Sequence, residues 1–135
     1  MAGNRKTAEE KNPKIVTLGT NTAGEVKIAD DVVAAIAVLA ANEVEGLDDM
    51  AGTIGTRLMN TVGVKQSGKG VRVDVVDGMV RVDLAITLKH GYSIRETGRR
   101  IQEKVKASIE NMTGLTVTDV NIYVAGVNTE SRRES

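Results

Sequence analysis

Residues 71–127 constrain the fold more than any other part of this chain of 135 residues. Their apolar pattern predicts a β-hairpin over 71–88, an amphipathic helix over 93–112 and a strand over 115–124. A hairpin followed by a helix and a further strand favours a sheet with a helix packed on one face.

The hairpin turn fixes how its two strands pair. Asp77-Gly78 is a two-residue turn of the type I′ kind, which places Val76 opposite Met79. This register aligns the valines of both strands on one face. On the other face it produces two pairs of opposite charge, Arg72 with Asp83 and Asp74 with Arg81.

An earlier strand and helix complete the expected fold. Gly24–Ile28 alternates as a short strand, and Asp30 or Asp31 can cap a helix that runs to about Asn42. The order is then β-α-β-β-α-β. This order predicts a single α+β domain with a mostly antiparallel sheet and two helices on one face.

The flanks of the chain lack apolar periodicity. We expect a flexible N-terminal arm over residues 1–23, a folded domain over 24–127 and a flexible C-terminal tail over 128–135. Residues 51–70 are rich in glycine and read as a long loop.

Composition excludes several classes of function. The net formal charge is zero, which gives no general attraction to nucleic acid or anionic lipid, and the chain has no cysteine and one histidine. The polar start lacks a signal peptide, and the longest apolar run, Val32–Ala41, is too short for a bilayer span of about 20 residues. We therefore expect a cytoplasmic protein that reaches a membrane only through a partner.

The first helix is apolar on every side, whereas a surface helix has one apolar stripe. In one interpretation its small residues pack tightly on the sheet, with Ala34, Ala35 and Ala41 outward. In the other, a second face is buried against another subunit. The candidate interface residues are then Ala34, Ala35, Val38 and Ala41.

The second helix offers a candidate surface for an anionic partner. It carries Arg95, Arg99 and Arg100, although interleaved glutamates favour an ordinary solvated face. Ser93 and Glu96 form a capping box at its start, and Gly114 ends it.

No residue set supports catalysis. His90 lies near Ser93 in sequence, but that serine is needed as the helix cap, and Asp48-Asp49 lacks further metal ligands. We expect no enzyme, no cofactor and no metal site.

One alternative function remains open. The segment Gly52-Thr53-Ile54-Gly55, with Arg57 nearby, matches the GXXG loop of KH modules, so a KH-like RNA-binding or regulatory module is the alternative.

The chain also resembles a known family. The resemblance is carried by Gly24–Val33, Asn42–Leu47, Gly70–Val73, Ser93–Glu96, Ile101–Val105, Asn111–Leu115 and Val120–Val127. In pattern and order these segments are similar to the bacterial alkaline shock protein 23 family.

The resemblance implies a non-enzymatic protein of envelope stress and cell-envelope homeostasis. It implies self-association into a homo-oligomer and docking to a small membrane-protein partner, with no nucleic acid bound and no insertion into the membrane.

Overall fold

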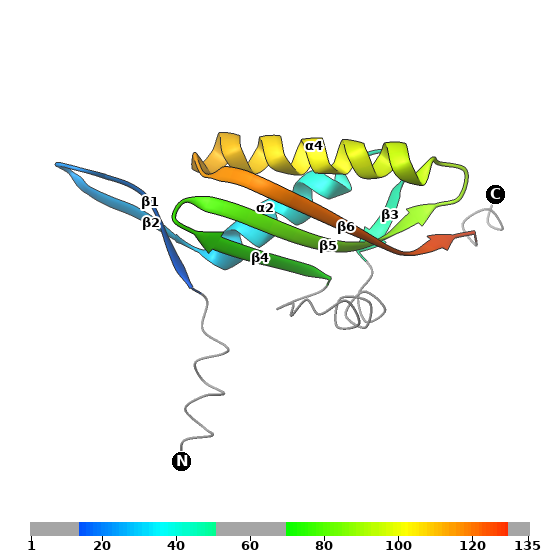
Figure 1. Cartoon of the computed structure of the whole chain (residues 1–135), viewed down its shortest axis with the longest axis horizontal. Coiled ribbons are helices and arrows are strands. Elements are labelled where there is room, and N and C mark those ends of the chain that lie inside the picture. The colour runs from blue at the N-terminus through cyan, green and yellow to red at the C-terminus, as the bar shows by residue number, and fades with distance from the viewer. Residues whose placement is uncertain (1–13, 51–69, 130–135) are drawn as a thin grey trace, which may run out of the picture.

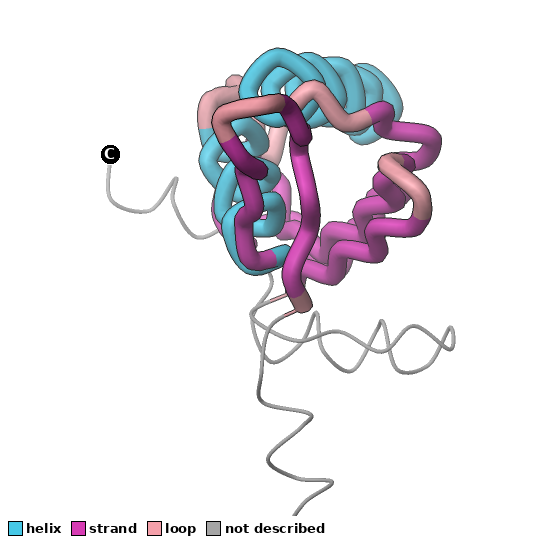
Figure 2. Tube along the Cα trace, turned by 90° about the vertical axis from the view of Figure 1, so that its left-hand side faces the viewer, coloured by secondary structure: helices cyan, strands magenta, loops and turns pink. Residues whose placement is uncertain are grey.

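The computed structural model describes residues 14–50 and 70–129. In chain order the elements are β1 (Ile15–Asn21), β2 (Gly24–Ala29), α2 (Asp30–Asn42), β3 (Leu47–Met50), β4 (Val71–Val76), β5 (Met79–Lys89), α4 (Ile94–Thr113) and β6 (Thr116–Asn128) (Figure 1). Both helices lie on one side of the strands (Figure 2). The expected α+β class is confirmed, and β1 and β3 are additional to the expected order.

Strand β5 is the centre of the main sheet. Antiparallel β4 pairs with its first half and antiparallel β3 with its second half, while β6 runs parallel along its other edge. The β5 side chains that face the helices are fully buried: Val80, Val82, Leu84, Ile86 and Leu88. Because β5 has neighbours on both edges, its apolar row forms the floor of the core.

The predicted hairpin register is confirmed at every pair from Val76 with Met79 to Val71 with Leu84. Asp77 and Gly78 both have positive φ, at 53° and 77°, as a type I′ turn requires. Arg72 lies opposite Asp83 and Asp74 opposite Arg81, as expected. Ion pairs run along each strand, from Arg72 to Asp74 at 3.0 Å and from Arg81 to Asp83 at 3.8 Å.

The pairing of the last strand, β6, is irregular at two positions. The register between β5 and β6 shifts at Thr118, between Val117 and Asp119. A second shift occurs at Ala125. Between these two shifts the pairing is regular, and Val120, Ile122 and Val124 pack against the core.

The expected flexible arm over residues 1–23 is wrong for β1, which forms a separate two-stranded sheet with β2. Val16 is buried in the core and Leu18 packs against it, so alternate apolar residues anchor this strand. The short apolar signal in Ile15–Leu18 is diluted by polar neighbours in the sequence. Figure 1 shows the hairpin projecting from the body of the molecule.

The expected cap of the first helix is wrong. The N-cap of α2 is Ala29, and no side chain in the part of the chain that the structure describes caps the helix. The Asp30 carboxylate instead accepts a hydrogen bond from the Lys14 backbone N–H at 3.2 Å, while the Asp30 N–H donates to the Lys14 carbonyl at 2.7 Å. The chain just before β1 therefore satisfies the first turn of α2, and the sequence of the helix alone does not show this contact.

Helix α4 begins and ends as predicted. The Ser93 hydroxyl accepts from the Glu96 N–H at 3.2 Å, and Gly114 is in the left-handed conformation at the C-terminal end. Its buried row is Thr97, Ile101, Val105, Ile109 and Thr113. These residues are four apart, and the row includes neither Ile94 nor Met112, which are both exposed.

Candidate functional site

The outer surface of α2 carries apolar side chains that the core does not use. Leu39 is 65% exposed and Val32 is 43% exposed, and the smaller Ala35 between them is also exposed. Their spacing of three and four residues places them on one side of the helix. We call Val32, Ala35 and Leu39 the α2 stripe.

The structure separates the four interface residues expected from the sequence. Ala35 is exposed, while Ala34 and Val38 are half-buried and pack against the core. Ala41 is fully buried, so its outward placement is wrong. It lies four residues after Ala37 and eight after Val33, on the helix side that faces the sheet. Val32 and Leu39 of the α2 stripe were not among the expected interface residues, although their spacing from Ala35 could have indicated them.

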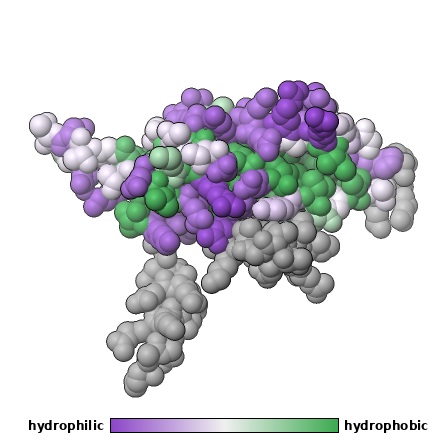
Figure 3. Space-filling view, in the orientation of Figure 1, coloured by the Kyte–Doolittle hydropathy of each residue, from purple (hydrophilic) through white to green (hydrophobic). Residues whose placement is uncertain are grey.

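A groove lies between α4 and β6. It has a volume of about 330 Å³ and is lined by Ile94, Arg95, Gly98, Arg99, Gln102, Ile122 and Val124. The lining is apolar and cationic, and no carboxylate contributes to it among the described residues. We call this the α4–β6 groove. In Figure 3 hydrophobic residues gather between the hydrophilic top of α4 and the polar part of the sheet.

Gly98 helps to open this groove. A Cβ built on Gly98 meets no atom within 4 Å. The glycine therefore does not serve a close approach of the helix to the sheet. Ile94, next to it in the groove, is 51% exposed.

The expected basic residues of α4 divide between two settings. Arg95 and Arg99 line the groove, whereas Arg100 is exposed outside it. The Glu96 carboxylate accepts a hydrogen bond from Arg99 at 3.1 Å. This bond and the charges of Glu96 and Glu103 raise the pKa of the Arg99 guanidinium above its usual value. Among the described residues, Arg95 forms no ion pair.

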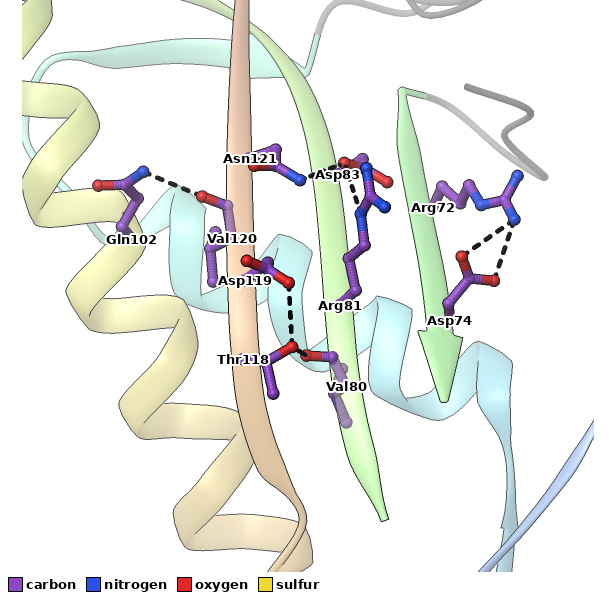
Figure 4. A network of polar contacts seen from close by, with 10 residues as sticks. All are labelled: Arg72, Asp74, Val80, Arg81, Asp83, Gln102, Thr118, Asp119, Val120 and Asn121. Atoms are coloured by element: carbon purple, nitrogen blue, oxygen red, sulfur yellow. Dashed lines mark hydrogen bonds and ion pairs between the residues drawn. The ribbon is translucent and has the colours of Figure 1, made fainter. Parts of the chain in front are cut away.

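One end of the groove is closed by a hydrogen bond to the sheet edge. The Gln102 amide donates to the Val120 carbonyl at 2.9 Å, as Figure 4 shows. A side chain thus occupies a position on β6 where a neighbouring strand would bond. Beyond it lies a smaller hollow of about 180 Å³, lined partly by Glu103, Lys106 and Asp119.

The sheet face away from the helices is polar and internally paired. Asp83 is 1% exposed and accepts a hydrogen bond from the Asn121 amide at 2.8 Å (Figure 4). Thr118 donates to the Val80 carbonyl at 3.2 Å. Because these side chains satisfy one another, we assign this network a structural role.

The residues considered for catalysis do not form a site. His90 follows the end of β5, and its backbone N–H donates to the Asn128 carbonyl at 3.2 Å. The Ser93 hydroxyl is engaged at the helix cap. Asp48 accepts from the Asn128 amide at 2.9 Å, and Asp49 accepts from the Met50 N–H at 2.8 Å.

Two further findings concern the part of the chain that the structure describes. It contains no group of three or more residues that could hold a metal ion. Neither of its helices has the length and apolar character needed to cross a membrane. The GXXG segment Gly52–Gly55 and Arg57 lie outside the described residues.

The fold and these surfaces define a small α+β protein with an apolar helix surface and a groove at a sheet edge. Residues 19–129 match the model of the alkaline shock protein 23 family, which is described as having a cell envelope-related function. The chain belongs to this family.

The chain is also similar to individual proteins and to solved structures. The chain is 32% identical to the uncharacterised protein YqhY of Bacillus subtilis over 111 residues, which cover 82% of each chain. It is 32% identical to the uncharacterised protein YloU of the same organism over 106 residues, covering 77% of this chain and 88% of YloU. A variant of the MamM CTD shares 15% identity at a TM-score of 0.45, covering 72% of this chain and 94% of that one.

Proposed function

We propose that the protein is a non-enzymatic interaction module of the cell envelope that self-associates and docks to a membrane-protein partner. The observation that carries the self-association is the α2 stripe. A helix that buries one side in the core normally exposes polar residues on the other, yet α2 exposes Val32 and Leu39. Covering them with a second copy would remove apolar surface from water.

The family's envelope-related function supports the second part of the proposal. We propose that the protein is cytoplasmic and is held at the membrane by a membrane-protein partner. Neither described helix has the length and apolar character of a membrane span. The RNA-binding alternative gains no support from the comparisons or from the described residues.

Self-association is tested by sedimentation velocity of the full chain and of Leu39→Glu. A charge in the stripe should convert oligomers to monomers while the circular dichroism spectrum stays native, because Leu39 makes no core contribution. Met112→Glu is the matched control, since Met112 is 70% exposed on the other helix. An unchanged oligomer mass for Leu39→Glu would contradict a role of α2 in assembly.

Docking is tested by co-sedimentation of the full chain with inverted membrane vesicles from a native host. We expect binding that survives nuclease and high salt and disappears after the vesicles are treated with protease. Binding to protein-free liposomes would favour direct lipid contact, and loss of binding after nuclease treatment would favour the RNA-binding alternative. Either result would overturn the proposed mode of docking.

A further inference from the structure

The α4–β6 groove combines three features that together suit one kind of occupant. Its floor is apolar, its rim is cationic, and one side is the unpaired edge of β6, to which no second strand is added within the described residues. We propose that the groove binds an extended, acidic and apolar segment of a partner protein, which adds as a strand to β6. This inference rests on the proposed docking function and names the surface that performs it.

The edge of β6 offers backbone groups for such pairing. Because the Val120 carbonyl accepts from Gln102, its backbone points away from β5. Successive residues of a strand alternate in this direction, and the pairing with β5 is regular from Asp119 to Val124. The N–H and C=O groups of Ile122 and Val124 therefore point to the free edge, where an added strand can bond to them.

The groove beside this edge accepts side chains. In an added strand every second side chain would point toward α4, over Ile122 and Val124. Gly98 leaves open space there, and Ile94 supplies exposed apolar surface above it. The apolar part of the occupant thus gains contacts that a polar strand would not.

The charges select an acidic occupant. Arg95 and Arg99 both line the groove. Among the described residues only Arg99 of these two has a carboxylate partner, and no acidic residue contributes to the lining. A carboxylate on the added strand would complete an ion pair with Arg95. A lysine or arginine in the same place would meet two like charges. A second copy of the chain is a less suitable occupant. If the β6 strands of two copies paired, each would bring its own Arg95 and Arg99 toward the same positive charges of the other copy.

The chemistry of the occupant is tested by displaying random twelve-residue peptides and selecting them on the full chain. We expect enriched sequences in which apolar residues alternate and at least one aspartate or glutamate is present. Hydrogen exchange of the complex should slow at the Ile122 and Val124 amides. Enrichment of basic or helical peptides, or unchanged exchange at these two amides, would overturn the proposal.

The location is tested with variants that change the groove and leave the fold intact. Gly98→Leu fills the open space and replaces glycine by a better helix former, so the helix should persist. We expect it to weaken the selected peptides at least 10-fold, with Gly98→Ala giving a smaller loss. Arg95→Glu should give a comparable loss, whereas Arg100→Glu, an exposed residue outside the groove, should not. Equal binding by Gly98→Leu and the unaltered chain would exclude the groove.

The vesicle assay separates failure of this inference from failure of the proposed function. If the unaltered chain binds protease-sensitive sites and Gly98→Leu does not, both proposals hold. If Gly98→Leu binds vesicles as well as the unaltered chain does, docking stands and the groove proposal falls. If the unaltered chain does not bind vesicles, the docking function itself is wrong. Loss of oligomers in Gly98→Leu would identify a second copy as the occupant and would also overturn the proposal.

Discussion

Helices α2 and α4 lie side by side on the same face of the sheet, but they bury different side chains. The core side of α4 is built from Ile101, Val105 and Ile109, whereas that of α2 includes Ala37, Ala40 and Ala41. Their outer sides differ in polarity, because α4 exposes mainly charged residues and α2 exposes the apolar α2 stripe. The core side of α2 also buries Val33 and Ile36, while Val32 and Leu39 stay outside. The buried alanines let α2 pack closely, whereas α4 packs through larger residues.

The largest expected effect comes from a substitution that creates a cavity on the core side of α4. Ile109 is fully buried in the core, and Ile109→Ala should lower the free energy of unfolding by about 2–5 kcal/mol. The reason is that burial of the removed methylene and methyl groups is lost and the surrounding helix and sheet relax only partly. Urea unfolding followed by circular dichroism measures the change. A loss below about 1 kcal/mol would show that α4 contributes less to the core than its burial indicates.

The matching test on α2 adds volume in place of removing it. Ala37 is fully buried in the core, so Ala37→Leu should lower the free energy of unfolding by about 1–3 kcal/mol through overpacking. Ala35→Leu, on the exposed side of the same helix, is the control and should change stability by less than about 0.5 kcal/mol. The same urea experiment compares them. Equal effects at both positions would contradict the close packing of α2.

The contrast also explains how much could be predicted from the sequence. The hairpin register, the cap of α4 and its terminal glycine depend on residues close together in the chain, and all were predicted correctly. The buried threonines of α4 were missed because an apolar pattern does not include them. Thr113 can be buried because its hydroxyl donates to the Ile109 carbonyl at 2.6 Å and accepts from the Leu115 N–H at 3.1 Å.

Features that depend on contacts between distant segments were not predicted. The first turn of α2 is bonded by Lys14, which precedes it by a whole hairpin. The α4–β6 groove is recognisable only once β6 is known to be an edge strand that runs parallel to β5. Two of its lining residues, Arg95 and Arg99, were expected to bind an anionic partner, but their apolar neighbours in the groove were not connected to them.

The smallest expected effect tests whether the two helices really begin by different means. Ser93→Ala removes the hydroxyl that caps α4 and should cost about 1 kcal/mol. In α2 the N-cap is Ala29, whose extended backbone (φ −76°, ψ 148°) suits a capping serine, so Ala29→Ser should gain up to about 1 kcal/mol. Thermal unfolding of both variants against the unaltered chain provides the comparison. A neutral Ser93→Ala would mean that tertiary contacts hold the start of α4 as they hold α2. A loss in Ala29→Ser would mean that the pairing of Ala29 with Ile15 leaves no room for a cap, and that the start of α2 depends wholly on β1.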